Sequence, residues 1–178
     1  MVQAEAVALQ SESGVLARAA QGDEDAFALL VRRHQGMVFS VALHFFRDRA
    51  LAEDMAQDVF VQLYQSLRTI ESESHLVFWL RQVAVRKCID HGRSRGKRQQ
   101  VSLEEVAERG APAVTADVLA DARVRRLVAA LPEKFRAVVV LRFQEDLSPV
   151  EMAGVLGWRV NTVKTRLHRA LKMLRERL

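Results

Sequence analysis

Apolar residues recur along this chain every three or four positions, which is the periodicity of amphipathic helices. The first such stripe follows Asp23, a residue suited to capping, and consists of Phe27, Leu30, Val31 and His34. We expect Gly36 to interrupt this helix, and a second apolar helix to follow through Val38, Val41, Ala42 and Phe45. Residues 1–21 are expected to form a short, frayed N-terminal tail.

Two further helices are predicted before residue 99. One begins at Asp48 and places Met55, Val59, Leu63 and Leu67 on one face, with Glu53, Asp54, Gln57, Asp58 and Val61 opposite. A polar loop over residues 68–74 separates it from a helix at about 75–90, which is apolar on two sides and is therefore central to a bundle or covered by a partner. The basic run HGRSRGKRQQ that follows is broken by glycine, and we expect it not to fold alone.

The pattern changes over residues 99–116. This segment has Gly, Pro, Thr and small residues, with room for one helical turn capped by Ser102, and it predicts a flexible linker. Helical periodicity resumes near Asp117, breaks at Leu131-Pro132 and continues in a helix that Pro132 starts. The β-branched cluster at 138–140 is flanked by helix formers. The predicted fold class is all-α, with small helical domains over residues 22–98 and 117–178 joined by the linker.

The C-terminal segment predicts two short helices joined by a tight turn. Ser148 and Glu151 match a capping box around Pro149, and Asn161 is suited to cap the second helix. The second helix has an apolar stripe through Val163, Leu167, Ala170 and Leu174, and its other faces are basic. This pattern is typical of a helix-turn-helix whose second helix enters the DNA major groove. The alternative is a surface hairpin with a solvated basic face.

The residues expected to contact DNA from this second helix and its turn share polarity and an outward position. They are Arg159, Thr162, Lys164, Thr165, Arg166, His168, Arg169 and Lys172. Arg166 and Arg169 suit guanine edges or phosphates, whereas Arg159 and Lys172 are expected at the DNA backbone. Trp158 stands in the turn and is expected to cover the hairpin or to contact DNA.

Charge is segregated along the chain. The net charge is +5, with basic residues gathered at 81–98 and 159–177, whereas residues 52–58 are acidic. This separation predicts different partners for different faces, with a polyanion for the basic ones. The single cysteine, Cys88, excludes an internal disulfide and fits a reducing cytosol. With neither a signal peptide nor a membrane-spanning stretch evident, a soluble cytoplasmic protein is expected.

Other chemistry finds little support in the sequence. Gly92 to Lys97 resembles a phosphate-binding loop but has the wrong glycine spacing and lacks the following Ser or Thr. The five histidines show no metal-ligand spacing with each other or with Cys88. Since no nucleophile and base form a recognisable pair, we expect no enzyme activity, metal, cofactor or small-molecule substrate.

Several segments in order resemble the bacterial sigma-70 family, and specifically its small extracytoplasmic-function (ECF) group. They are GDEDAFALLVRRH, AEDMAQDVFVQLYQSL, FWLRQVAVRKCIDHGRSRGKR, LPEKFRAVVVLRFQEDLSPVEMAGVLG and NTVKTRLHRALKML. The resemblance implies that residues 22–98 are sigma region 2 and residues 117–178 are sigma region 4. It further implies an alternative sigma factor for a stress or envelope response. Its partners would be core RNA polymerase, through the β′ coiled coil and the β flap, promoter DNA and an anti-sigma factor, in the cytoplasm and at the nucleoid when active.

The resemblance also assigns roles to particular residues. Core polymerase would bind the acidic set Glu53, Asp54, Gln57 and Asp58, although an ordinary solvated face is the alternative for these positions. The loop over residues 66–75 would receive an unstacked base of the −10 element. The flanking DNA would contact Arg81, Arg86, Lys87, Arg93, Arg95, Lys97 and Arg98. The helix-turn-helix would recognise the −35 element. In the linker, Glu104, Glu105 and Glu108 would mimic nucleic-acid charge in the polymerase cleft.

Two points stay open from sequence alone. Phe78 and Trp79 are both candidate stacking platforms for a base, although for Trp79 packing in the core is the better interpretation. Two competing functions also stay open. The first is a stand-alone repressor or activator, and the second is a polymerase-binding adaptor without promoter function. The acidic helix argues against the first, and the intact basic blocks argue against the second.

Overall fold

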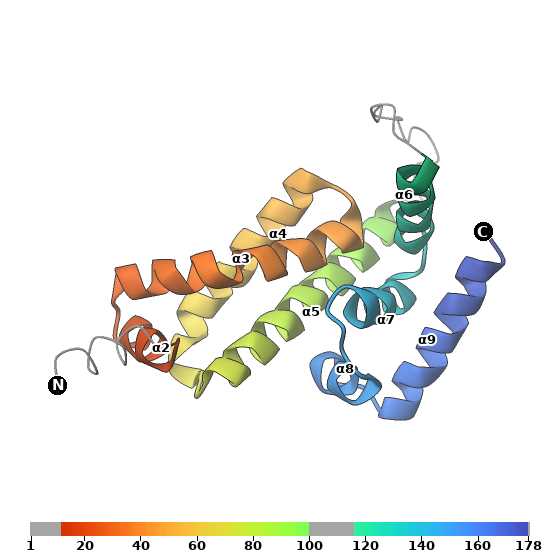
Figure 1. The fold of residues 1–178 in the computed structure, drawn as a ribbon. Coiled ribbons are helices and arrows are strands. Elements are labelled where there is room, and N and C mark those ends of the chain that lie inside the picture. Colours follow the sequence, from red (N-terminus) through yellow and green to blue (C-terminus); the bar gives the residue numbers. More distant parts are fainter. Residues whose placement is uncertain (1–11, 100–115, 178) are drawn as a thin grey trace. The chain divides into compact units, whose positions relative to one another are not determined.

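All regular elements in the described part of the chain are helices, in agreement with the predicted all-α class (Figure 1). The computed structural model describes residues 12–99 and 116–177. They form two compact units, one built on residues 12–43 and 48–85 and the other on residues 44–47, 86–99 and 116–177. Residues 100–115 lie outside the described residues, so the expectations for Ser102, Glu104, Glu105 and Glu108, and the predicted domain boundaries, stay predictions.

The first unit contains the helices α2 (Glu12–Ala20), α3 (Glu24–Phe46) and α4 (Arg49–Ser66), the 3-10 turn η1 (Leu67–Thr69) and the start of α5 (Glu73–Gln99). Its core consists of the inward faces of these helices, with Leu30, Val59, Leu63 and Leu80 fully buried. Burying such a leucine or valine side chain contributes roughly 1.5–3 kcal/mol each. The apolar stripes predicted from the sequence therefore supply the core.

The N-terminal tail contains a helix that the sequence pattern did not predict. In α2, Val15, Leu16 and Ala19 are buried, and the helix packs against η1. Asp23 then caps α3, as predicted, because its Oδ1 accepts a hydrogen bond of 2.9 Å from the Ala26 amide. This bond, followed by the one that Arg18 donates to Asp23, holds the pKa of Asp23 below its usual value.

The prediction that Gly36 interrupts a helix is wrong. Helix α3 runs without a break from Glu24 to Phe46. One apolar stripe passes along it on both sides of the glycine, through Ala26, Leu30, Val38, Val41 and Ala42, all buried. A glycine inside a helix costs only about 1 kcal/mol relative to alanine, which is less than the burial on either side supplies.

Helix α5 is longer than expected at both ends. It begins at Glu73 and includes the glycine-containing basic run through Gln99, which was expected not to fold alone. Arginine, lysine and glutamine are good helix formers, and they continue a helix that packing has already nucleated. Cys88 lies in this helix and is fully buried, and burial raises the pKa of its thiol to about 12. The thiol therefore stays protonated and unreactive at neutral pH.

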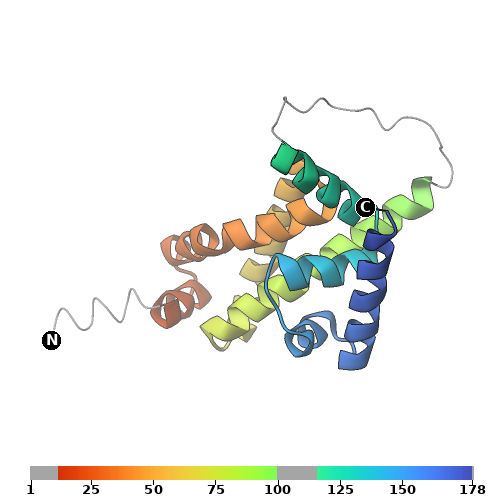
Figure 2. The same cartoon turned by 45° about the vertical axis from the view of Figure 1, so that its right-hand side comes forward.

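The second unit adds α6 (Ala116–Ala129), α7 (Glu133–Phe143), α8 (Pro149–Leu156) and α9 (Val160–Arg175). Helices α7 and α8 pack against α9, and α6 touches both α7 and α9 (Figure 2). Five consecutive residues of α7, Ala137 to Leu141, are buried, so the middle of this helix is covered on all sides, whereas Phe143 at its end is 65% exposed. The β-branched cluster at 138–140 therefore lies in a buried helix rather than in a strand.

Stability of the first unit should fall as the pH drops below about 6.5, the ordinary pKa of histidine. His34 belongs to the buried stripe of α3 and is 9% exposed, and desolvation lowers its pKa. Below pH 6.5 the unfolded chain takes up a proton that the folded chain excludes, so the stability present above this pH is lost as the pH falls through the folded pKa.

Urea unfolding at pH 7.5 and pH 5.5 measures this effect. His34→Leu should remove much of the loss, whereas His168→Gln, on the exposed surface of α9, should retain it. An equal pH response in wild type and His34→Leu would contradict the assignment.

Candidate functional site

The predicted acidic face lies on α4. Asp48 caps this helix, since its Oδ1 accepts a hydrogen bond of 3.1 Å from the Leu51 amide. The side chains predicted to bind a protein partner, Glu53, Asp54, Gln57 and Asp58, are all exposed. Glu53 Oε1 lies 2.9 Å from Nε of Arg49, one turn earlier, so part of its charge is compensated on the helix itself. The structure thus brings the predicted set together on one accessible surface.

An apolar groove adjoins this acidic face, and sequence reasoning missed it. It lies between α3 and α4 and has a volume of about 790 Å³. Its apolar walls are Phe27, Val31, Phe39, Phe60, Val61 and Tyr64, and Glu53 and Gln57 line its edge. Val61 and Tyr64 are 51% and 52% exposed, on the same side of α4 as the acids. Apolar residues within an otherwise polar helix face were the signal available in the sequence.

Two aromatic contacts join side chains that line this groove. Phe27 and Tyr64 meet edge to face with their ring centroids 5.1 Å apart. The guanidinium of Arg49 lies 5.7 Å from the centroid of the Phe39 ring. An exposed apolar groove beside an acidic helix face is typical of a surface that binds an amphipathic, basic helix.

The loop predicted to receive a base is a fixed structure. Leu67 and Ile70 are buried and anchor it. Ser72 caps α5, because its Oγ accepts a hydrogen bond of 3.2 Å from the His75 amide, and Nδ1 of His75 accepts one of 3.3 Å from the Glu71 amide. This reciprocal arrangement holds the loop at the N-terminus of α5, with Ser72 and Glu71 exposed.

The aromatic and basic residues of α5 differ in exposure. Phe78 is 39% exposed, whereas Trp79 is half-buried. Arg86 is exposed, and Arg81 and Lys87 are half-buried. The remaining basic residues predicted to contact DNA also belong to α5, but their side chains lie outside the described part of the structure. These residues are Arg93, Arg95, Lys97 and Arg98. Of the two candidate stacking platforms, Phe78 is therefore the more accessible.

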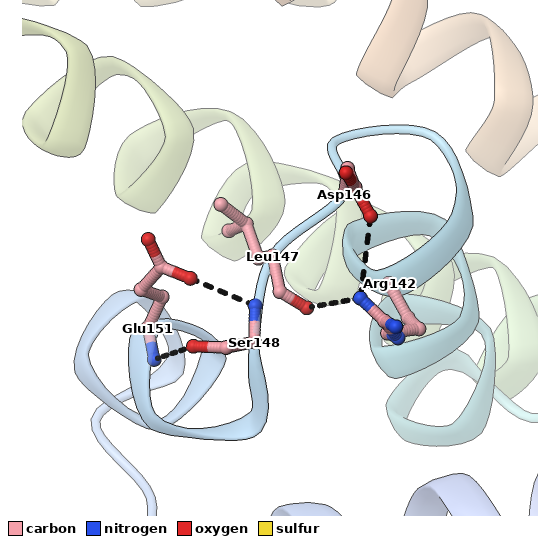
Figure 3. Close-up of polar contacts among 5 residues, drawn as sticks. All are labelled: Arg142, Asp146, Leu147, Ser148 and Glu151. Atoms are coloured by element: carbon pink, nitrogen blue, oxygen red, sulfur yellow. Dashed lines mark hydrogen bonds and ion pairs between the residues drawn. The ribbon is translucent and has the colours of Figure 1, made fainter.

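The turn between α7 and α8 positions the predicted helix-turn-helix (Figure 3). Nη1 of Arg142 donates to the Asp146 carboxylate and to the Leu147 carbonyl, both at 3.3 Å. The predicted capping box is confirmed: the Ser148 amide donates to Oε2 of Glu151 at 2.8 Å, and the Glu151 amide donates to Oγ of Ser148 at 3.3 Å. These bonds fix the angle at which α8 enters the unit.

The turn between α8 and α9 depends on Gly157. This residue adopts the left-handed conformation, with φ 66° and ψ 32°. The Gly157 amide donates to the Gly154 carbonyl, and the Trp158 amide donates to the Ala153 carbonyl at 3.0 Å, which is the Schellman arrangement. The left-handed conformation of Gly157 therefore ends α8.

The predicted cap of α9 is wrong. Helix α9 begins at Val160 with Arg159 at the N-cap, and Arg159 makes no capping bond through its side chain. Asn161 lies within the first turn and is exposed. The Schellman turn sets where α9 starts, and the helix starts two residues too early for Asn161 to act as the cap.

The basic helix α9 presents a shallow hollow of about 350 Å³ near its N-terminus. Asn161, Thr162, Thr165, Arg166 and Arg169 line it. Val163, Ala170 and Leu174 are buried on the opposite side, and Leu167 is half-buried. The guanidinium of Arg166 lies 4.0 Å from the centroid of the Trp158 ring. The lining contains no carboxylate, so the hollow suits an electronegative ligand.

The structure gathers some of the predicted DNA contacts in this hollow and leaves others outside it. Thr162, Thr165, Arg166 and Arg169 belong to the lining, and Asn161, expected to act as a cap, belongs there too. Arg159, Lys164, His168 and Lys172 are exposed but do not line it. Lys172 lies 3.9 Å from Glu176 in an exposed ion pair, which is too weak to hold it in place.

Gly157→Ala should destabilise the fold by roughly 1–2 kcal/mol, because an L side chain in the left-handed region meets the following carbonyl. Gly36→Ala is the matched control: this glycine is exposed within α3 and an added Cβ has nothing within 4 Å, so the change should stabilise by about 0.5–1 kcal/mol. Urea unfolding measures both. Equal effects would show that the turn does not require a glycine.

Within residues 12–99 and 116–177, no cluster of His, Cys, Asp and Glu side chains is arranged to hold a metal ion. In the same part of the chain, no helix is both long and apolar enough to cross a membrane.

Comparison with known proteins matches two stretches of the chain to described families. Residues 30–98 match the model of sigma-70 region 2, and residues 121–174 match that of sigma-70 region 4. The chain is 29% identical over 173 residues to the ECF RNA polymerase sigma factor SigW of Bacillus subtilis, covering 89% of this chain and 91% of that protein. It is 33% identical over 152 residues to the RNA polymerase sigma-E factor of Streptomyces coelicolor, covering 85% of each.

Among solved structures, the fold is similar to that of CnrH in complex with the cytosolic domain of CnrY. The TM-score is 0.66 at 27% identity, covering 93% of this chain and 95% of that one. The sigma factor RpoE of Bartonella quintana, in complex with the anti-sigma factor NepR, also has a TM-score of 0.66, at 23% identity over 84% of this chain and 94% of that one, which shows a shared fold.

Proposed function

This chain belongs to the sigma-70 family, in its ECF group, and from that membership we propose that it is an alternative sigma factor. It binds core RNA polymerase and directs initiation at promoters by recognising −10 and −35 elements and assisting promoter opening. One observation carries the proposal: a single chain combines an acidic, grooved helix face with a basic helix-turn-helix. A protein surface and a DNA surface are both needed to join polymerase to a promoter.

Core polymerase binds the α4 face in this proposal. Glu53, Asp54, Gln57 and Asp58 attract the basic side chains of the β′ coiled coil, and the adjoining groove accepts its apolar ones. An apolar centre with a charged rim is the usual composition of a protein interface.

The β flap binds the second unit. Phe143 at the end of α7 and Val150 at the start of α8 are 65% and 67% exposed there, on either side of the turn that Arg142 holds.

The loop before α5 and the first turns of α5 receive the −10 element. A base leaves the stack at a cost of a few kcal/mol, and a fixed pocket with an accessible ring compensates for that cost. The loop is held by Ser72 and His75, and Phe78 supplies an exposed ring one turn into the helix. The basic residues of α5 named above then contact the flanking phosphates, which makes affinity dependent on salt.

The hollow on α9 recognises the −35 element. Arg166 and Arg169 suit guanine edges, and Thr162 and Thr165 suit either bases or phosphates. Arg159, Lys164, His168 and Lys172, which lie outside the hollow, contact the DNA backbone and orient the helix in the groove.

We further propose that an anti-sigma factor restrains this chain. The support is that CnrH, which is similar over most of both chains, was solved with the cytosolic domain of CnrY. The apolar groove beside α4 is a surface that such an inhibitor and core polymerase would compete for. The protein acts in the cytoplasm and at the nucleoid, without catalytic activity of its own and without a cofactor.

The competing function is a stand-alone repressor that uses the same helix-turn-helix. Genomic DNA fragments captured by the purified chain, with and without core polymerase, separate the two. A sigma factor enriches promoter fragments only when core polymerase is present, whereas a repressor enriches its operator without it. Enrichment of the same fragments in both conditions would contradict the proposal.

A further inference from the structure

We propose that Trp158 is a positioning residue that fixes Arg166 for recognition of a guanine in the −35 element. The inference rests on the proposed DNA-binding role of α9 and adds a residue outside that helix. The Arg166 guanidinium lies 4.0 Å from the Trp158 ring centroid, well within the range of a cation–π contact. Tryptophan is the side chain that makes this contact best.

The backbone of Trp158 is fixed before any ligand arrives. Gly157, in the left-handed conformation, turns the chain out of α8, and the Trp158 amide is bonded to the Ala153 carbonyl at 3.0 Å. Met152, Val155 and Leu156 of α8 are buried, so the helix that supports the turn is itself firmly packed. The indole is therefore a platform whose position relative to α9 is set by the fold.

Arg166 gains a defined orientation from this platform. An arginine side chain is long and has many rotamers in water, and ordering it on binding reduces affinity. When the guanidinium stacks on a ring, the N–H groups at its edge still point outward in one plane, in the fork that matches O6 and N7 of guanine. Stacking thus orders the side chain without consuming the donors that recognise the base.

The surroundings of Arg166 in the hollow leave its guanidinium available to a ligand. Arg166 lies in its lining with Thr162, Thr165 and Arg169, and no acidic side chain is there to compete for the guanidinium. Arg169, one turn further along, has no ring contact among those found in the described residues. The two arginines therefore differ: Arg166 is held for a planar, base-specific contact, and Arg169 adapts to its ligand.

A double-mutant cycle on the holoenzyme tests the inference. The holoenzyme first selects from a duplex library randomised over the −35 region, and binding to the selected duplex and to its single-base variants is then measured. The chain carries Trp158→Leu, Arg166→Ala or both, with Trp158→Phe as the conservative variant. Circular dichroism confirms that each variant is folded at the assay temperature.

Trp158→Leu should lower the preference for one selected G·C pair by roughly three- to tenfold, and Trp158→Phe should retain most of it. In the Arg166→Ala background, Trp158→Leu should have less than about a twofold effect, because the side chain that it positions is gone. If Trp158→Leu weakens binding equally in both backgrounds, Trp158 merely covers the hairpin and the inference is wrong.

Tryptophan fluorescence provides a readout that needs no DNA. The chain contains two tryptophans, so Trp79→Phe leaves Trp158 as the single reporter. Arg166→Ala should change the Trp158 emission and Arg169→Ala should not. Equal responses to the two substitutions would contradict the proposed contact between Arg166 and Trp158. If the wild-type holoenzyme selects no −35 sequence, the proposed function itself fails. If the holoenzyme selects a −35 sequence but the effects of the two substitutions are additive, the proposed function stands and only the role of Trp158 is refuted.

Discussion

Replacing Asp54 and Asp58 with lysine should abolish binding to core polymerase, raising the Kd by about a hundredfold or more. The two carboxylates are exposed and lie one turn apart on α4, on the acidic face that also carries Glu53, and Glu53 lines the apolar groove. Glu53 is already paired with Arg49, so reversing these two aspartates changes the sign of the surface that faces a basic partner. Like charges brought together at an interface cost several kcal/mol. Binding of labelled chain to purified core polymerase, without DNA, measures the change.

A control variant with the same change in net charge distinguishes an effect of the acidic face from an effect of the total charge. Glu24→Lys combined with Glu71→Lys alters two exposed acidic residues of the same unit that lie outside α4 and its acidic face. This variant should bind core polymerase within a few fold of wild type at physiological salt, where charges further apart than about 8 Å are largely screened. Core binding that survives the Asp54 and Asp58 reversal, or that is lost equally in the control, would refute the role of the acidic face.

Arg166→Ala should weaken holoenzyme binding to its preferred −35 element by about 1–3 kcal/mol and relax the preference at one base pair. Arg166 lines the hollow on α9, and its guanidinium is oriented by Trp158. Loss of a bidentate contact to guanine leaves that base edge without its partner, so the matched sequence loses more than a mismatched one. Titrations with matched and single-mismatch duplexes measure this difference.

Lys172→Ala provides the matched comparison on the same helix. Lys172 is exposed, lies outside the hollow and forms an exposed ion pair with Glu176. A phosphate contact should be lost uniformly across sequences, and the slope of log K against log salt should fall by about one. An Arg166→Ala variant that behaves like Lys172→Ala, with a uniform loss and an unchanged base preference, would show that Arg166 contacts phosphate rather than a base.

Local signals in the sequence predicted the fold class and much of the candidate site. The capping box at Ser148 and Glu151 requires only residues three apart, and the structure forms it. The acidic face of α4 follows from helical periodicity, and Glu53, Asp54, Gln57 and Asp58 are all exposed. Periodicity and capping are properties of one segment, so a single sequence is sufficient to recognise them.

The errors arose where tertiary structure outweighs a local preference. Gly36 was expected to interrupt α3, but the buried stripe on both sides outweighs the cost of one glycine. Asn161 was expected to cap α9, but after the left-handed turn at Gly157 the N-cap is Arg159, two residues before Asn161. In both cases the residue type was interpreted correctly in isolation, and the packing around it decided the outcome.

The features that the sequence could not supply are contacts between elements. The groove beside the acidic face exists because Phe27 and Val31 of α3 lie opposite Phe60 and Tyr64 of α4. The contact of Arg166 with Trp158 joins the second helical turn of α9 to the loop between α8 and α9. Neither pairing has a sequence period, so each had to come from the three-dimensional structure.

Run-off transcription with the purified chain, core polymerase and a promoter template selected by the holoenzyme tests the central claim most directly. We expect a transcript of defined length that requires both the chain and the −10 and −35 elements, and that is absent with core polymerase alone. Tight binding to core polymerase without any promoter-dependent transcript would contradict it and would instead indicate an adaptor that has lost promoter function.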